Sequence, residues 1–369
     1  MSTHGEAPAP LSECDEPLAS RYDVALLDLD GVVYVGPDPV PEAPDHLRKA
    51  AKEGMRIGYI TNNASRPARV VAEHLASFGL DVIADDVVTS AQAAAKLIAS
   101  EYPKGSPVLV IGGEGLYAAL EEYGLTPVRS SDARPVAVVQ GFHPDVNWVM
   151  LADGAHAINE GAKWFATNLD LTIPTAGGMA PGNGTLVQAV RAAVEVDPVI
   201  AGKPAPPLLE TSIERLKAKK PLMIGDRLDS DIAGAHAVGI ASLWVATGVH
   251  DAHDLARAPK NERPTYIAPD LAALAQKQPG VTVDGSKHTC VGWTAEVVNG
   301  AVAIKGEGEP YDGLRAILSA VWTATDEPKA PAKTAKSATR SSRRPLPKPA
   351  PALGTIAVDA ALHRIGLEK

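Results

Sequence analysis

Short apolar runs alternate with longer amphipathic stretches between Tyr22 and about Gly248. The run VALL, which precedes Asp28, is continuously apolar, as expected of a parallel strand that is covered on both faces. The longer stretches carry apolar residues at every third or fourth position, which is the spacing of an amphipathic helix. This alternation predicts βαβ units, and therefore an α/β fold with a mainly parallel sheet.

The predicted elements follow one another in the order expected of such units. Strands are predicted within residues 23–30, 55–63, 107–113, 135–142, 163–170, 221–226 and 241–248. Helices are predicted within residues 41–54, 66–78, 115–124, 147–161, 185–196, 206–220 and 229–239. The alternation from about residue 90 to 175 fits either a continuation of the first sheet or an inserted domain, and the pattern leaves both open.

The remaining parts of the chain have a different pattern. Residues 1–20 are rich in Pro, Glu and Ser, which predicts a disordered N-terminal tail. Residues 280–325 predict a small α+β unit with two or more strands and an amphipathic helix. Residues 326–351, rich in Pro, Ala, Ser and basic residues, predict a disordered linker. Residues 352–369 are expected to form a short segment that docks as a helix.

Composition narrows the class of protein. The 369 residues carry a net charge of −9, which disfavours nucleic acid as an obligate partner, because phosphate backbones bind to basic faces. Only two cysteines, Cys14 and Cys290, occur, and no apolar run is long enough to span a bilayer. We therefore expect a cytoplasmic protein without a disulfide framework and without a membrane partner.

Polar side chains lie where predicted strands end or helices begin. These residues are Asp28, Asp30, Thr61, Asn62, Lys203 and Asp226. Ligands of open parallel sheets bind at the carboxyl ends of the strands, so we expect these loops to converge at one edge. Three carboxylates, an ammonium group and a hydroxyl suit a magnesium ion together with a phosphate group.

The residue types predict separate roles in phosphoryl transfer. Asp28 and Asp226 are the natural pair of Mg²⁺ ligands, and Asp28 is the candidate nucleophile, since a carboxylate can form an aspartyl-phosphate. Asp30 projects from the same side of the chain and can move the proton of the leaving group. Gly31 permits a sharp turn next to these groups. Lys203 supplies a positive charge that offsets the carboxylates.

Four motifs, taken in order, resemble those of the haloacid dehalogenase (HAD) superfamily of phosphatases. They are DLDGVVY at Asp28, ITNN at Thr61, GKP at Lys203 and IGDRLDSDI at Asp226. The long insertion between ITNN and GKP, which contains ATNLDLTIPTAGGMAPGNGT, resembles subfamily IIA, whose members carry an α/β cap of type C2. The resemblance covers about residues 22–275, and the four motifs together are highly specific.

The resemblance implies both an architecture and a set of roles. It implies a Rossmann-like core (residues 21–89 and 178–275) with a C2 cap (residues 90–177). It implies that Asp28 is the nucleophile and Asp30 the acid/base, and that Asp28, the Asp30 carbonyl and Asp226 bind Mg²⁺. The residues implied to bind substrate are Thr61, Asn62, Asn63 and Lys203. Asp231 is implied to lie next to the metal site without binding the metal itself.

The small C-terminal unit sharpens the expected substrate. A cap-type phosphatase followed by a truncated acetyltransferase-like unit resembles the actinobacterial glycerol 3-phosphate phosphatases. The stretch 289–306 is too short for a complete acetyl-CoA site, so acetyl transfer is not expected. The stretch VLVIGGEGL also resembles half of a dinucleotide site, but it lacks the G-x-G-x-x-G spacing, and a tight turn is favoured.

The expected function is therefore Mg²⁺-dependent hydrolysis of a small phosphomonoester, with glycerol 3-phosphate as the leading substrate. Phosphoglycolate, 4-nitrophenyl phosphate or a nucleotide are the alternatives within the family. An alternative of another class is a sensor that binds a phosphorylated metabolite without catalysis. The intact pair of Asp28 and Asp30 disfavours a sensor, because binding alone needs no acid/base. A homodimer formed through the cap or the C-terminal unit is left open.

Overall fold

The computed structural model describes residues 6–175, 177–326 and 356–367. The chain divides into two compact units. Unit 1 contains residues 1–250 and 259–278, and unit 2 contains residues 251–258 and 279–369. The predicted linker, residues 326–351, lies almost wholly outside the described residues. Each unit is described by itself below.

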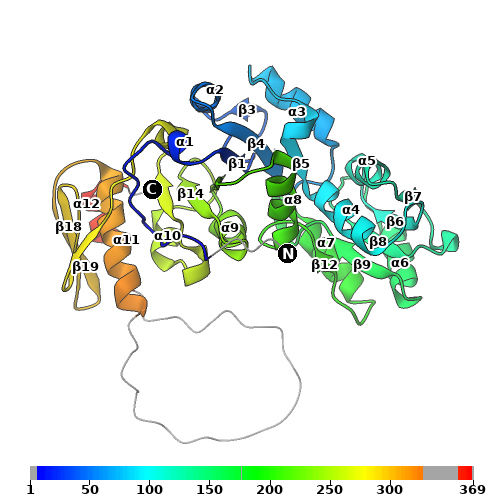
Figure 1. The fold of residues 1–369 in the computed structure, drawn as a ribbon. Helices are drawn as coiled ribbons and strands as arrows, with labels where there is room; N and C mark the ends of the chain where they lie inside the picture. Colours follow the sequence, from blue (N-terminus) through cyan, green and yellow to red (C-terminus); the bar gives the residue numbers. More distant parts are fainter. Residues whose placement is uncertain (1–5, 176, 327–355, 368–369) are drawn as a thin grey trace, which may run out of the picture. The chain divides into compact units, whose positions relative to one another are not determined.

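Six parallel strands form the first sheet of unit 1 (Figure 1). Their order is β15 (Tyr266–Ala268), β14 (Ala241–Val245), β13 (Pro221–Gly225), β1 (Val24–Leu27), β4 (Arg56–Thr61) and β5 (Val87–Thr89). All four residues of β1 are buried, and alternate residues of this strand enter two different apolar clusters. The strand is therefore covered on both faces, which explains its continuous apolar run.

Helices cover both faces of this sheet. One cluster contains residues of α2 (Ala43–Lys52) and α3 (Ala68–Ser77), and the other contains residues of α4 (Ser90–Glu101) and α8 (Pro206–Leu216). The predicted α/β class and the mainly parallel sheet are confirmed.

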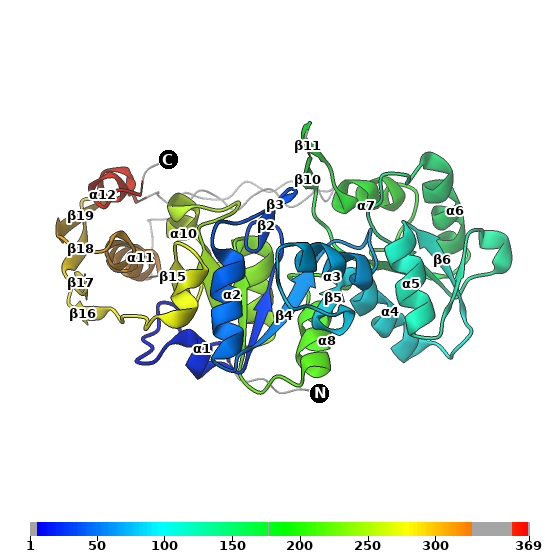
Figure 2. The ribbon, with the colours of Figure 1, turned by 90° about the horizontal axis from the view of Figure 1, so that it is seen from above.

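Five parallel strands form a second sheet in unit 1 (Figure 2). Their order is β12 (Val199–Ile200), β9 (Lys163–Ala166), β8 (Ala137–Gln140), β6 (Pro107–Ile111) and β7 (Thr126–Val128). Residues of α6 (Trp148–Asn159) and α7 (Asn183–Arg191) pack on one face of this sheet, and α4 and α5 (Glu114–Glu122) pack on the other. The alternation after residue 90 is thus a separate sheet. Because β12 pairs with β9, this sheet extends past residue 177, where the expected cap ended.

Short elements complete unit 1. They are α1 (Leu18–Arg21), β2 (Tyr34–Val35), β3 (Asp38–Pro39), η1 (Ala84–Asp86), η2 (Ser131–Ala133), β10 (Thr172–Thr175), β11 (Gly178–Pro181), η3 (Leu228–Ile232), α9 (Ala233–Ala237), η4 (Lys260–Glu262) and η5 (Leu271–Ala275). The predicted helix within 229–239 is in fact a π-helical turn, η3, followed by α9. The hairpin of β10 and β11 was not expected from the sequence.

The prediction of disorder for residues 1–20 is wrong for their C-terminal half. Cys14 and Gln278 exchange two main-chain hydrogen bonds of 2.8 and 2.9 Å. Leu18 is fully buried, in the same apolar cluster as Leu271 of η5. Cys14, Leu18 and Ala19 all belong to this cluster, although the Pro and Glu residues around them give the segment a composition that is typical of disorder.

Unit 2 contains a four-stranded antiparallel sheet, in agreement with the expected α+β class. Its strands, in order, are β16 (Thr282–Asp284), β17 (Lys287–Cys290), β18 (Trp293–Val298) and β19 (Ala301–Gly306). Helix α11 (Pro310–Asp326) packs on β17 and β18, and the expected C-terminal helix, α12 (Asp359–Arg364), contacts β19. Helix α10 (Ala252–Arg257) also belongs to this unit, and Trp322 Nε1 of α11 donates to its Leu255 carbonyl at 3.0 Å.

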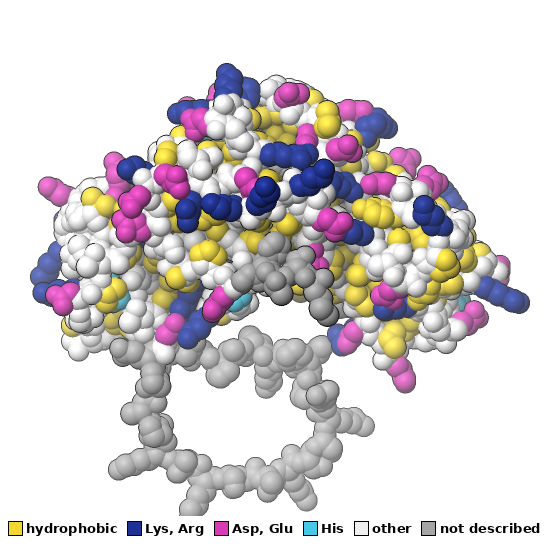
Figure 3. Space-filling model, viewed as in Figure 1, with side chains coloured by type: hydrophobic (Ala, Val, Ile, Leu, Met, Phe, Trp, Pro, Cys, Tyr) yellow, Lys and Arg dark blue, Asp and Glu magenta, His cyan; other side chains and the backbone are white. Residues whose placement is uncertain are grey.

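Among the described residues, no helix has both the length and the apolar character needed to cross a membrane. On the face of the molecule seen in Figure 3, Lys and Arg side chains are interspersed with Asp and Glu side chains. Both cysteines are buried free thiols.

The packing of Leu18 can be tested by substitution. Leu18→Ala is expected to lower the free energy of unfolding by about 2–5 kcal/mol, because it removes a fully buried side chain and leaves a cavity. Urea denaturation measures this change. The exposed neighbour Ser20 provides the control, since Ser20→Ala should leave the stability nearly unchanged. Equal stability of the Leu18→Ala variant and the wild type would mean that residues 1–20 do not pack as described.

Candidate active site

The order of the strands brings the predicted site together. β1 lies between β13 and β4 at the centre of the first sheet, and all three are parallel. Their carboxyl ends therefore meet at one edge, where Asp28 follows β1, Asp226 follows β13 and Thr61 ends β4. The expected convergence of loops is confirmed for these strands.

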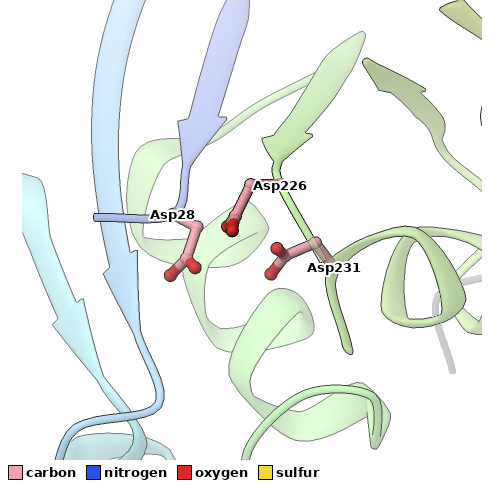
Figure 4. A group of neighbouring side chains, drawn as sticks. All are labelled: Asp28, Asp226 and Asp231. Carbon is pink, nitrogen blue, oxygen red and sulfur yellow. The ribbon is translucent and has the colours of Figure 1, made fainter. Parts of the chain in front are cut away.

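Three carboxylates form the centre of the site (Figure 4). Oxygen atoms of Asp28, Asp226 and Asp231 lie within 4.8 Å of one another. Asp226 and Asp231 are fully buried, whereas 13% of the Asp28 side chain is exposed. Asp28 is therefore the most exposed of the three carboxylates.

Lys203 lies between two of these carboxylates. Its Nζ is 2.8 Å from Asp28 Oδ1 and 2.6 Å from Asp231 Oδ1, and the residue is 2% exposed. Burial alone would lower the pKa of Lys203, but the charges of Asp231 and Asp28 outweigh burial and raise its pKa. The side chain is therefore a fixed ammonium ion that is buried between the carboxylates.

The positive charge of Lys203 does not balance the negative charges of the three carboxylates. Burial, followed by the charges of Asp231 and Asp28, raises the pKa of Asp226. Burial and Asp28 also raise the pKa of Asp231, although Lys203 opposes this. The site therefore has an excess of negative charge, which a bound cation would relieve.

The hydrogen bonds indicate which oxygen atoms are available to such a cation. Both oxygens of Asp231 are used, one by Lys203 Nζ and the other by the Arg227 amide at 3.0 Å. Asp226 Oδ2 accepts from the Val249 amide at 2.6 Å, but its buried Oδ1 has no partner among the described residues. Asp226 Oδ1 and the second oxygen of Asp28 are oxygen ligands of the kind that Mg²⁺ prefers. This distribution fits Asp28 and Asp226 as ligands and Asp231 as the residue that holds Lys203.

Two glycines make room for Asp226. Gly31 adopts φ +85°, and a Cβ placed there would lie 2.7 Å from Asp226 Oδ2. A Cβ at Gly248 would lie 2.0 Å from the same oxygen. Gly31 thus allows the sharp turn expected after Asp30 and the close approach of the chain to the carboxylates.

Asp30 lies on the exposed side of the site. Partial burial and the charge of Asp28 raise the pKa of Asp30 to about 6, although Arg66 and Lys203 oppose the shift. A carboxyl group with such a pKa can both donate and accept a proton near neutral pH. Arg66 was not singled out from the sequence, and its charge also acts on Tyr34, the residue whose backbone bridges to Asp30.

The loop after β4 is ordered by its own side chains. Thr61 is buried, and its Oγ1 accepts from the Asn63 amide at 3.0 Å. Asn63 is exposed, and its Oδ1 accepts from the amide and the hydroxyl of Ser65. Asn62 Oδ1 accepts from the Lys203 amide at 2.9 Å, and its Nδ2 donates to the Lys203 carbonyl at 3.0 Å. The substrate contacts expected of these three residues stay predictions.

The Gly-rich turn of VLVIGGEGL contacts the same loop. The amide of Gly115, in α5, donates to the Ser65 carbonyl at 3.3 Å. A Cβ at Gly115 would lie 2.2 Å from the Ala64 carbonyl oxygen. The start of α5 therefore packs on the backbone that follows β4, which accounts for the glycine and supports the interpretation as a tight turn.

These features define a class of enzyme: a parallel α/β sheet whose central strand ends in a reachable carboxylate, held beside a buried lysine and a carboxylate site for a hard cation. The chain belongs to the haloacid dehalogenase-like hydrolase family. Residues 25–126 match the model of the haloacid dehalogenase-like hydrolases, and residues 200–274 match a HAD-hydrolase-like model. Residues 290–341 match the model of a GCN5-related N-acetyltransferase-like domain.

Two curated relatives are similar over most of their length. The D-glycerol 3-phosphate phosphatase of Mycobacterium tuberculosis is 43% identical over 316 residues, which are 83% of this chain and 88% of that protein. The acid sugar phosphatase of Staphylococcus aureus is 35% identical over 253 residues, which are 68% of this chain and 96% of that protein. The resemblance to the HAD phosphatases is thereby confirmed.

Solved structures agree with this assignment. The crystal structure of a glycerol phosphate phosphatase from M. tuberculosis in complex with magnesium has a TM-score of 0.80 at 39% identity, and the match covers 96% of this chain and 100% of that chain. The p-nitrophenyl phosphatase from Archaeoglobus fulgidus has a TM-score of 0.64 at 29% identity, covering 69% of this chain and 98% of that chain. The match to the first structure extends over unit 2, whereas the second matches a shorter part.

The excess charge predicts how metal affects stability. Because the pKa of Asp226 is raised to about 8 in the folded chain, this group contributes stability to the metal-free protein that is fully present below about pH 4, the ordinary pKa of a carboxyl group, and that is lost as the pH rises through about 8. Asp226→Asn should weaken this pH dependence and should abolish most of the rise in Tm caused by Mg²⁺. Thermal unfolding with EDTA or with Mg²⁺, at several pH values, measures both effects.

The control is Asp145→Asn, which removes a carboxylate whose side chain is 90% exposed. This variant should behave like the wild type in both conditions. If Mg²⁺ stabilised the Asp226→Asn variant as strongly as the wild type, Asp226 would not be a ligand.

Proposed function

We propose that this chain is a Mg²⁺-dependent phosphomonoesterase that hydrolyses glycerol 3-phosphate to glycerol and phosphate. The observation that carries the proposal is the environment of Asp28. Its Oδ1 is held 2.8 Å from Lys203 Nζ, while its side chain remains accessible beside an undercompensated carboxylate pair. That arrangement orients a carboxylate at a site that attracts a cation and a phosphate.

The residues support a two-step reaction. Asp28 attacks phosphorus, and the bond from phosphorus to the leaving oxygen breaks as Asp30 gives that oxygen a proton. Water then attacks the aspartyl-phosphate and loses a proton to Asp30, which frees Asp28 and inorganic phosphate. Lys203 balances the charge of the transferring group and keeps Asp28 in position. A Mg²⁺ ion held by Asp28, Asp226 and the Asp30 carbonyl would neutralise phosphate charge.

Glycerol 3-phosphate is favoured by the relatives. The M. tuberculosis protein that is 43% identical is a D-glycerol 3-phosphate phosphatase, and its match covers 88% of that protein. Phosphoglycolate and 4-nitrophenyl phosphate are the nearest alternatives, and the match to a solved p-nitrophenyl phosphatase covers 69% of this chain. We also propose a cytoplasmic location, which suits the two buried free thiols. The homodimer and the division into core and cap stay predictions.

A screen for phosphate release tests the proposal. Purified protein is incubated with glycerol 3-phosphate, phosphoglycolate, 4-nitrophenyl phosphate and a nucleoside monophosphate, with Mg²⁺ or with EDTA. We expect release in Mg²⁺ alone and the highest kcat/KM for glycerol 3-phosphate. Higher kcat/KM for phosphoglycolate would reject the proposed substrate. No release from any of the four would favour the phosphometabolite sensor.

Substitution of the two aspartates separates their roles. Asp28→Asn should abolish turnover and preserve the fold, because an amide cannot form the aspartyl-phosphate. Asp30→Asn should lower kcat by about 10²- to 10⁴-fold, the usual contribution of general acid–base catalysis. It should affect 4-nitrophenyl phosphate less than glycerol 3-phosphate, because nitrophenolate leaves without a proton. Turnover by the Asp28→Asn variant at the wild-type rate would disprove the nucleophile assignment.

A further inference from the structure

Asn62 lies in the loop that follows β4, where this loop meets two other segments of unit 1, the chain at Lys203 and the loop 168–170. Its side chain makes a two-point hydrogen bond with the main chain of Lys203, donating to the carbonyl at 3.0 Å and accepting from the amide at 2.9 Å. Its carbonyl accepts from Ser90 Oγ at 2.6 Å and from Asn168 Nδ2 at 2.7 Å. Both polar atoms of the Asn62 side chain are therefore engaged within the protein.

The third segment is the loop 168–170, which follows β9 of the second sheet. Asn62 Nδ2 also lies 3.4 Å from Asp170 Oδ2, so the loop contacts both the main chain and the side chain of Asn62. Burial raises the pKa of Asp170, while Arg227, Asn62 and Lys203 oppose this shift. The carboxylate thus lies in the electrostatic field of the catalytic groups, although it was not among the expected site residues.

The first turn of α7 fixes this loop. Asn183 Nδ2 donates to the Asn168 carbonyl at 2.8 Å, and the Gly184 amide donates to the Asp170 carbonyl at 2.9 Å. A Cβ at Gly184 would lie 2.1 Å from the Leu169 carbonyl oxygen, so the close approach requires glycine. The Asp170 amide in turn donates to Asn168 Oδ1 at 3.1 Å. Helix α7 therefore fixes the position of the loop 168–170, which in turn contacts Asn62.

We propose that Asn62 and Asp170 are positioning residues, which transmit the placement of the loop 168–170 to Lys203. Asp170 orients the Asn62 amide, and Asn62 fixes the peptide of Lys203, whose Nζ contacts Asp28 and Asp231. The second sheet thereby contributes to the position of the catalytic ammonium through two hydrogen-bonded residues. The kinetic consequence rests on the phosphatase function proposed above, whereas the structural coupling does not.

Gly202 supports this arrangement. A Cβ at this residue would lie 2.6 Å from Asn62 Oδ1 and 2.3 Å from the Thr167 carbonyl oxygen. The chain before Lys203 therefore passes between Asn62 and the end of β9, and no side chain fits there. The glycine of the GKP motif has a role of its own, because it lets Asn62 reach the Lys203 peptide.

Amide hydrogen exchange tests the coupling without reference to activity. Exchange at the Lys203 amide is followed by NMR in the full chain. Asn62→Ala should speed this exchange, because the amide loses its acceptor, and Asp170→Ala should do so to a smaller extent. The nearby Ala201 amide, which donates to the Ala166 carbonyl at 3.0 Å, should keep its protection in both variants. Unchanged exchange at Lys203 in both variants would overturn the proposal.

A double-mutant cycle on kcat tests the route. Asn62→Ala should lower kcat by about 10- to 100-fold, as is usual when a partner that orients a functional group is removed. Asp170→Ala should lower kcat by a smaller factor, and it should cause no further loss in the Asn62→Ala background. The Asp170→Asn variant should keep most of the wild-type kcat, since an amide oxygen also accepts a hydrogen bond from Asn62. Additive losses would mean that Asp170 acts independently of Asn62 and would overturn the route.

Two substrates separate positioning from direct contact. A change that acts through Lys203 lowers the rate for glycerol 3-phosphate and 4-nitrophenyl phosphate by the same factor, because the transferring group is common to both. A changed ratio in Asp170→Ala would make Asp170 a contact of the leaving group and overturn the proposal. Asp153→Ala, which removes two hydrogen bonds to Ser131 in the same part of the chain, is the matched control and should leave the ratio, kcat and Lys203 exchange unchanged.

The outcomes of the two proposals are distinguishable. If the wild type releases no phosphate while Asp170→Ala and Asn62→Ala speed exchange at Lys203, the proposed function fails and the coupling stands. If the wild type is active but neither variant changes exchange or kcat, the coupling fails and the proposed function stands.

Discussion

The buried charge of Lys203 is the constraint on which the site depends. An ammonium group that is 2% exposed is stable only beside anions, and Asp28 and Asp231 supply them at 2.8 and 2.6 Å. Adding Asp226 makes three carboxylates against one ammonium, an excess of two negative charges. A divalent cation balances that excess. The affinity for a metal and the position of the nucleophile thus depend on the same buried charges.

The parallel order of the sheet explains why most of the site could be predicted from the sequence. Asp28, Thr61 and Asp226 each end a strand, and β1, β4 and β13 are neighbours, so their placement follows from the strand pattern and the rule for strand ends. The position of Lys203 before a helix was equally visible. Asp231 is brought back to the site by η3, a π-helical turn, where the sequence pattern predicted an ordinary helix.

Other features depend on contacts between distant residues, which one sequence does not display. Asn62 and Lys203 are 141 residues apart, and nothing local to Asn62 indicates that its side chain meets that peptide. Asp170 lies in the insertion between the ITNN and GKP motifs, but no sequence pattern distinguishes it from other loop aspartates. The prediction for the N-terminal segment was wrong for the opposite reason. Its composition suggested disorder, but three of its apolar residues, among them Leu18, pack against residues far along the chain. Composition describes average behaviour, and a few buried side chains can outweigh it.

Helix α10 has a consequence for how the two units can be separated. It lies between β14 and β15 in the sequence, and both of these strands belong to the first sheet, yet the helix is grouped with unit 2 and accepts a hydrogen bond from Trp322 of α11. The chain therefore leaves unit 1 after His250, returns at Pro259 and leaves again after Gln278. A cut after Gln278 would not release an intact module, because α10 would stay behind without α11. The residues of unit 2 therefore come from two separate stretches of the chain, and a single cut does not separate them from unit 1.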